Sequence, residues 1–120
     1  MQTENLDPNK PTAGSPETPI LSIAIVRPYP GKDAEVLAVL KDLYAILASK
    51  GYSSDELFQD AKDERYFNLR YWKSEESRRH AYDDSDVQRC WLRLSQICEV
   101  EQVYEKLHNL TENWITVEPR

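Results

Sequence analysis

The chain has 120 residues, 40% of them apolar and 30% charged, which is enough for one domain and excludes a second core. Its formal charge of −6 repels phosphate backbones, so no nucleic-acid partner is expected. It has no run of 18 apolar residues and hence no expected membrane span, which predicts a soluble cytoplasmic protein.

Residues 1–19 are predicted to form a disordered leader. They hold four of the seven prolines and one large aliphatic side chain, Leu6, and they lack the apolar segment of a secretory signal. The folded domain is expected over residues 20–107. Residues 108–120 are expected to form a C-terminal arm, in which Trp114 and its neighbours are either a short strand on a partner or a tail.

The domain begins with a predicted strand and a predicted helix. Residues 20–28, ILSIAIVRP, are rich in β-branched and aliphatic side chains, which favours a buried strand. From Asp33 to Lys50 apolar residues recur every three or four positions, which is the spacing of an amphipathic helix. Gly51 follows, where helices commonly end in the left-handed conformation.

The next two segments are predicted to form an antiparallel hairpin. Residues 52–60 are polar enough for an edge strand. The linker over residues 61–64 is short, and residues 65–73 make a second strand.

Bulky side chains alternate on both faces of that second strand. The row of Phe67, Leu69 and Tyr71 is apolar, so it is predicted to lie under helices. The other row needs polar partners, so it is predicted to face a second covered surface such as another sheet. It contains Tyr66, Asn68, Arg70 and Trp72.

A helical region follows in two pieces. Ser74, Glu75 and Glu76 form a helix start, because a hydroxyl can cap free amides and carboxylates suit the positive first turn. The acidic run at residues 83–86 interrupts the pattern and offers a second cap. A second helical segment then carries apolar residues along one side.

Cys90 and Cys98 lie in this second predicted helix. They are eight residues apart, roughly 12 Å at about 1.5 Å per residue, which is too far for a disulfide. Neither they nor the two histidines show metal-ligand spacing. We therefore expect buried thiols and no metal site.

Residues 99–107 are predicted to be the last strand. The resulting order is β-α-β-β-α-β, a ferredoxin-like α+β fold with a four-stranded antiparallel sheet. Helices on one side leave the other sheet face open. An exposed aromatic face would be a large apolar patch, so self-association through that face is expected.

Four further features lie between Ile20 and Leu107. They are Pro-x-Pro-Gly-Lys at residues 28–32, the Gly51-Tyr52 helix exit, the strand end Tyr71-Trp72, and the helix opening at Ser74 with His80 eight residues after Trp72. Together they resemble the antibiotic biosynthesis monooxygenase family. The resemblance implies a homodimer, a dimeric α+β barrel joined through its sheets, with a pocket between sheet and helices in each subunit. It also implies either oxygenation of phenols without metal or flavin, haem degradation, or no known activity.

The haem-degrading branch is expected not to apply. Its members are similar around residues 85–87, but they carry an iron-ligating histidine about seven residues after that serine, where residues 90–92 here read Cys-Trp-Leu. Tyr82 replaces their tryptophan, and an apolar residue, Ala24, replaces their asparagine. Without an axial ligand we expect no haem, and no other cofactor.

Three polar residues are candidates for catalysis or binding. The near-neutral pKa of histidine suits His80 as a general base for a phenol or an enolisable carbon. Asn68 and Arg70 are candidates to hold a substrate oxygen or stabilise an enolate. The alternatives are that His80 is an exposed residue bonded to a carboxylate such as Asp83 or Glu76, and that the other two tie sheets together.

Several aromatic residues are candidates to line a pocket for a small aromatic ligand, with ordinary core packing as the alternative. They are Tyr44, Tyr71, Trp72, Tyr82 and Trp91. Two functions are therefore predicted. One is a cofactor-independent monooxygenase acting on a phenolic or quinol-type molecule, and the other is a non-catalytic dimeric binding or structural module.

Overall fold

A computed structural model describes residues 19–111 and residue 114. The elements are β1 (Ile20–Pro28), α1 (Asp33–Ser49), β2 (Ser53–Gln59), β3 (Tyr66–Trp72), α2 (Glu75–Tyr82), α3 (Ser85–Ile97) and β4 (Cys98–Leu107). This confirms the predicted order, with the second helical region in two pieces. The predicted leader, apart from Pro19, and most of the predicted arm beyond Thr111 lie outside the described residues.

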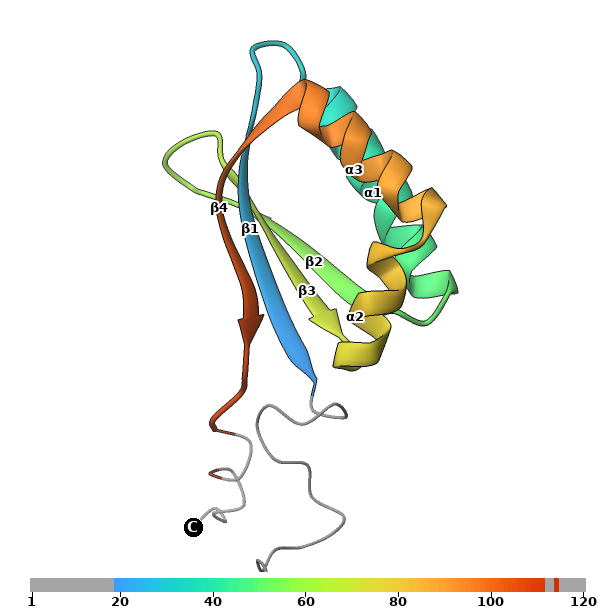
Figure 1. The fold of residues 1–120 in the computed structure, drawn as a ribbon. Helices are drawn as coiled ribbons and strands as arrows, with labels where there is room; N and C mark the ends of the chain where they lie inside the picture. Colours follow the sequence, from blue (N-terminus) through green and yellow to red (C-terminus); the bar gives the residue numbers. More distant parts are fainter. Residues whose placement is uncertain (1–18, 112–113, 115–120) are drawn as a thin grey trace, which may run out of the picture.

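The four strands form one antiparallel sheet in the order β2-β3-β1-β4. The helices lie on one side of this sheet (Figure 1). The predicted hairpin is confirmed, with Ser53 of β2 opposite Trp72 of β3. No helix in the described part of the chain has the length and hydrophobicity needed to span a bilayer.

The apolar stripe of α1 covers the sheet. Its fully buried side chains are spaced four, three and four residues apart, as one face of a helix requires. Gly51 follows the helix with φ of 74°, a left-handed conformation that glycine adopts without steric cost. The buried stripe consists of Val36, Leu40, Leu43 and Leu47.

Side-chain caps start the two shorter helices. The hydroxyl of Ser74 accepts a hydrogen bond from the backbone N–H of Ser77, which confirms the predicted start of α2. The carboxylate of Asp84 accepts from the first backbone amides of α3, and it also receives hydrogen bonds of 2.8 Å from Lys50 and Tyr52. Asp84 therefore ties the end of α1 to the start of α3.

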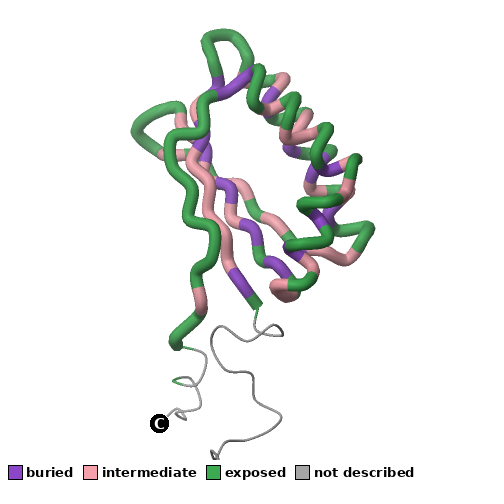
Figure 2. The backbone as a smooth tube through the Cα atoms, viewed as in Figure 1, coloured by how far each residue is buried: buried purple, intermediate pink, exposed green. Residues whose placement is uncertain are grey.

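The row of β3 that contains Asn68 is buried and lines the space between the sheet and the helices, so the prediction that it faces another sheet is wrong. Buried and less buried residues alternate along β3 (Figure 2). The hydroxyl of Tyr44 on α1 bonds Asn68, and Tyr66 of the same row bonds Asp33 at the start of α1. The polar partners of this row come from the same subunit. The row predicted to lie under helices is on the opposite face, and it consists of Phe67, Leu69 and Tyr71.

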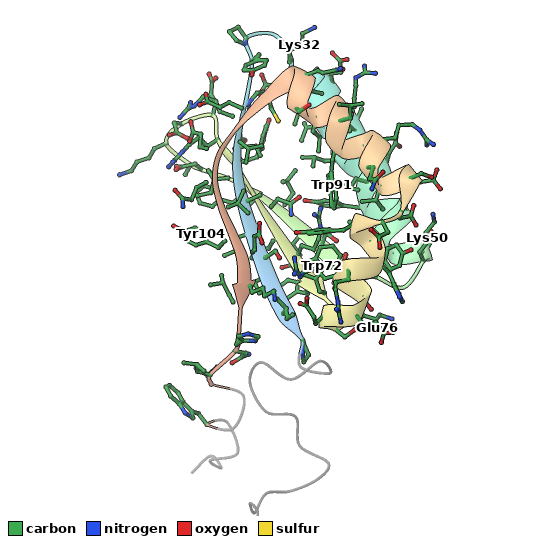
Figure 3. The ribbon with its side chains drawn as sticks, in the orientation of Figure 1. Lys32, Lys50, Trp72, Glu76, Trp91 and Tyr104 are labelled. Carbon is green, nitrogen blue, oxygen red and sulfur yellow. The ribbon has the colours of Figure 1, made fainter. Side chains whose placement is uncertain are left out.

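That opposite face carries apolar side chains from all four strands and no helix of the described chain (Figure 1). Ile23 of β1 lies between Leu69 of β3 and Tyr104 of β4. Tyr104 is 45% exposed and projects away from the helices (Figure 3). We call this surface the outer sheet face. Its apolar residues are Leu21, Ile23, Ile25, Phe58, Phe67, Leu69, Tyr71, Tyr104 and Leu107, and the register also places Ser54, Glu56 and Gln102 on it.

Candidate functional site

A cavity of about 290 Å³ lies between the sheet and the helices. Residues of β1, β3 and β4 line one wall, and residues of α1, α3 and the end of α2 line the other. Val100 and Val103 line it from β4 and are 50% and 47% exposed, so the cavity is open to solvent along this strand. Its volume is at the small end of the range for organic ligands.

Three aromatic side chains form one end of the cavity. The ring of Tyr82 meets that of Trp72 edge-on at 6.5 Å between centroids, and that of Trp91 edge-on at 5.2 Å. Figure 3 shows Trp72 and Trp91 between the sheet and the helices. The indole N–H of Trp72 donates to the hydroxyl of Ser22 at 2.8 Å. Because this polar atom is already paired, Trp72 offers mainly its apolar surface to a ligand.

Asn68 lies in the floor of the cavity and is 5% exposed. Its Oδ1 atom accepts a hydrogen bond of 2.5 Å from the hydroxyl of Tyr44. Burial, followed by the nearby charge of Asp55, raises the pKa of Tyr44, so this hydroxyl keeps its proton and remains the donor. With its oxygen occupied, Asn68 has its amide N–H groups to offer as donors.

Arg70 lies next to Asn68 in the same row and also lines the cavity. Its Nε donates to Asp55 of β2 at 2.5 Å, and the two side chains are 11% and 1% exposed. The hydroxyl of Ser53 donates to the other oxygen of Asp55 at 2.9 Å. Asp55 therefore neutralises the guanidinium and fixes its direction, as a buried charge requires.

Together these groups make a cavity floor with hydrogen-bond donors and aromatic walls. Such a floor suits a ligand with a carbonyl, phenolate or enolate oxygen, because donors stabilise negative charge that develops on that oxygen. The walls suit a flat ring.

His80 does not line the cavity in the described structure. Its side chain is 62% exposed on α2, and its Nε2 atom lies 4.0 Å from the carboxylate of Glu76. This position corresponds to the alternative of an exposed histidine beside a carboxylate. Its role as a base stays a prediction.

The other predicted site residues are brought close together. Asn68, Arg70, Trp72, Tyr82 and Trp91 line the cavity, and Tyr44 lies behind Asn68 as its hydrogen-bond partner. Tyr71, which the sequence analysis grouped with them, is 41% exposed on the outer sheet face.

Sequence reasoning missed Asp55, because the polar composition of β2 indicated an exposed edge. A signal was present, since a buried arginine on a neighbouring strand needs a carboxylate partner.

Cys98 also lines the cavity, and it is the first residue of β4 and not the last turn of the preceding helix. Both cysteines are free. Burial raises the pKa of the Cys98 thiol, and its Sγ donates to the carbonyl of Leu94 at 3.3 Å. The neutral thiol is therefore part of the apolar wall and a poor nucleophile.

Comparison with known proteins shows which family the chain belongs to. The model of the antibiotic biosynthesis monooxygenase family matches residues 19–91, well over half of the chain. The chain belongs to the antibiotic biosynthesis monooxygenase family. Among curated proteins, none matches it in sequence.

Solved structures share the fold of this family member at low sequence identity. SnoaB from Streptomyces nogalater, a cofactor-independent oxygenase, has a TM-score of 0.66 at 17% identity, covering 79% of this chain and 99% of its own. A conserved protein from Methanosarcina mazei has a TM-score of 0.63 at 21% identity, covering 76% and 95%. A protein from Pseudomonas aeruginosa has a TM-score of 0.65 at 20% identity, covering 81% and 99%. At such identities the likeness shows the fold alone.

Proposed function

We propose that this family member is a cofactor-independent monooxygenase that oxidises a small phenolic or quinol-type molecule in the cavity. The observation that supports this most directly is the floor formed by Asn68 and Arg70. Each side chain is held as a donor by a partner, Tyr44 or Asp55. Family membership and the fold shared with SnoaB, a cofactor-independent oxygenase, support the reaction class.

The chemistry requires a ligand that can itself reduce dioxygen. A phenol loses its proton, and the phenolate passes one electron to dioxygen. The two radicals combine to a peroxide at a ring carbon. The O–O bond then breaks, and one oxygen stays on the ring as a quinone carbonyl while the other leaves as water with the ring hydrogen and the phenolic hydrogen. Donors at the phenolate oxygen favour the first step, because they stabilise the deprotonated ligand.

The first step also requires a base, and His80 is our proposed base by residue type. A proton acceptor needs to come within hydrogen-bond reach of the ligand or act through a water. The exposed side chain of His80 does not contact the cavity in the described residues. The proposal therefore requires transfer through water at the open β4 side or a movement of α2.

This same observation favours a second candidate function. A cavity that binds a flat ligand without a base in contact fits a binding module that performs no turnover. Under this alternative the donors and aromatic walls recognise a small aromatic molecule and leave it unchanged.

We further propose a homodimer formed through the outer sheet face. Phe58 is 53% exposed there and Tyr104 45%, within a face that spans all four strands. A contiguous apolar surface of this kind marks an interaction site more often than a free surface. Two copies meeting on it by a two-fold axis bury the same residues on both sides.

The function is tested by oxygen uptake with a panel of phenols and quinols. We expect uptake with at least one compound, and a rate lower by about a hundredfold in Asn68→Ala, which removes one anion-stabilising donor. Asn109→Ala, an exposed asparagine outside the cavity, is the matched control. Binding without uptake supports the module, and neither binding nor uptake overturns both functions.

The substitution His80→Ala tests whether His80 is the base. A large loss of uptake with unchanged ligand affinity supports His80 as the base. Uptake equal to that of the original chain removes His80 from the mechanism and leaves the oxygenase proposal to the remaining groups.

A further inference from the structure

Arg78 on α2 is a buried cation with an unused donor. Its side chain is 9% exposed. The Nε and Nη2 atoms each donate to Glu75 at 3.1 Å, and these two atoms form one edge of the guanidinium. Nη1 is on the other side of the group, and it is buried without a hydrogen-bond partner in the described part of the chain. An unpaired buried donor is costly, most of all on a charged group.

Among the ion pairs of the described residues, a single carboxylate, that of Glu75, pairs with Arg78 and with two further cations. The carboxylate of Glu75 lies 3.1 Å from Arg78, 3.4 Å from Lys106 of β4 and 3.8 Å from Arg79. One anion is thus shared among three cations. Glu105 lines the cavity, but it forms no ion pair with Arg78 among the described residues. The local charge therefore favours a second anion.

This cluster adjoins the aromatic end of the cavity. The guanidinium carbon of Arg78 lies 4.9 Å from the ring centroid of Tyr82, a residue that lines the cavity. The ring face stabilises the cation, while Nη1 keeps no hydrogen-bond partner by geometry among the described residues. Tyr82 lines the cavity and is 39% exposed, and Arg78 lies over its ring without lining the cavity itself. A ligand in the cavity therefore reaches Nη1 only if the Tyr82 side chain turns.

We propose that Arg78 binds a carboxylate carried by the aromatic ligand, at the end of the cavity where Tyr82 stands. The inference rests on the proposed function, because it assumes an aromatic ligand in the cavity, and it adds that the ligand is an acid. In this arrangement Asn68 and Arg70 hold the ring oxygen while Arg78 holds the carboxylate. Lys106 adds a second positive charge near the same end. Arg78 is thereby a specificity residue for the proposed ligand.

The test compares two ligands that differ by one carboxylate. The ligands are 2-naphthol and 6-hydroxy-2-naphthoate, whose hydroxyl and carboxylate lie at opposite ends of the ring system. They are titrated against the full chain, with the fluorescence of the cavity tryptophans as readout. We expect the naphthoate to bind about ten- to a hundredfold more tightly, the range for a hydrogen-bonded charge. Its affinity is expected to fall with added salt more steeply than that of 2-naphthol.

Two substitutions locate the effect. Arg78→Met should remove the preference for the naphthoate and change the affinity for 2-naphthol much less. Arg79→Met removes the same charge from a side chain that is 65% exposed and should keep the preference. Arg78→Lys retains the positive charge but not the planar guanidinium with its several donors, so it should keep part of the preference for the naphthoate. If Arg78→Met does not fold, Arg78→Lys tests the assignment instead, and a preference for the naphthoate equal to that of the original chain overturns the role of Arg78.

The outcomes separate this inference from the proposed function. Equal affinity for the two ligands, or equal effects of the Arg78 and Arg79 substitutions, overturns the role of Arg78 and leaves the cavity as a binding site. Failure of both ligands to bind overturns the proposed function and the carboxylate site with it.

Discussion

The hydroxyl of Tyr44 on α1 donates a 2.5 Å hydrogen bond to Oδ1 of Asn68 on β3. A helix residue thus fixes the orientation of an amide in the cavity floor. The amide carries its donors away from the helix partner because its oxygen is already paired. Local packing of α1 against the sheet therefore determines which kind of atom a ligand meets.

Substituting Tyr44→Phe tests this relationship. Removal of the hydroxyl leaves the buried oxygen of Asn68 unpaired, so we expect the free energy of unfolding to fall by about 1–3 kcal/mol. Ligand affinity should fall as well, because the amide is then free to turn. Urea unfolding and ligand titration measure the two effects. Tyr29→Phe, at a tyrosine that is 43% exposed, should change stability by less than about 0.5 kcal/mol. Equal behaviour of the two variants contradicts the assignment.

The buried pair of Asp55 and Arg70 makes a second prediction. Asp55→Ala leaves the guanidinium of Arg70, whose side chain is 11% exposed, without its carboxylate partner. The free energy of unfolding should fall by about 3–5 kcal/mol. Removing both charges with Asp55→Leu and Arg70→Met should cost less than the sum of the single changes. A double-mutant cycle in urea gives the coupling. Additive losses would show that the two side chains do not depend on each other.

The outer sheet face makes a third prediction. Leu69→Lys places a charge in the centre of this face, so we expect a monomer by light scattering with an unchanged circular dichroism spectrum. Leu92→Lys makes the same change on α3, where the leucine is 63% exposed, and should leave the dimer intact. If the original chain is already a monomer at micromolar concentration, the proposed dimer is ruled out.

Trp72→Asp is expected to act differently from Leu69→Lys. Trp72 is 2% exposed and faces the cavity, so an unpaired charge there should prevent folding instead of separating subunits. The prediction from sequence had placed Trp72 at the subunit interface. A folded monomer of this variant would support that earlier placement.

The stability of the fold at acid pH tests the role of Asp84. Hydrogen bonds from Lys50 and then Tyr52 lower its pKa from 3.8 to about 2. Because the folded state holds the proton less tightly, the stabilisation is fully present above the ordinary pKa and is lost as the pH falls through about 2. Asp84→Asn keeps a capping side chain but removes the charge. Thermal unfolding should show a less stable variant at neutral pH and a difference that shrinks below pH 3.8. A constant difference over this range contradicts the shift.

The sequence by itself determined the elements of this protein and their order. The helical spacing of apolar residues in α1 and the hydroxyl cap at Ser74 act within a few neighbouring residues. Both can therefore be recognised in the sequence without knowledge of the fold. The left-handed Gly51 is equally local. The antiparallel hairpin followed from a short linker between a polar predicted strand and an alternating one. The features that resemble the family lie in the same segments, and the match of the family model to residues 19–91 confirms the resemblance.

Only the tertiary structure decided which side of β3 faces inward and where the site lies. Alternation in a strand separates two rows, but it does not say which is covered when both are bulky. The choice depended on Tyr44 and Asp55, which lie 24 residues before Asn68 and 15 before Arg70 and satisfy the polar row from within the subunit. The position of His80 outside the cavity was likewise set by how α2 packs. Hydrogen-bond partners distant in sequence meet only after folding, and for that reason the local pattern could not determine the chemistry of the cavity.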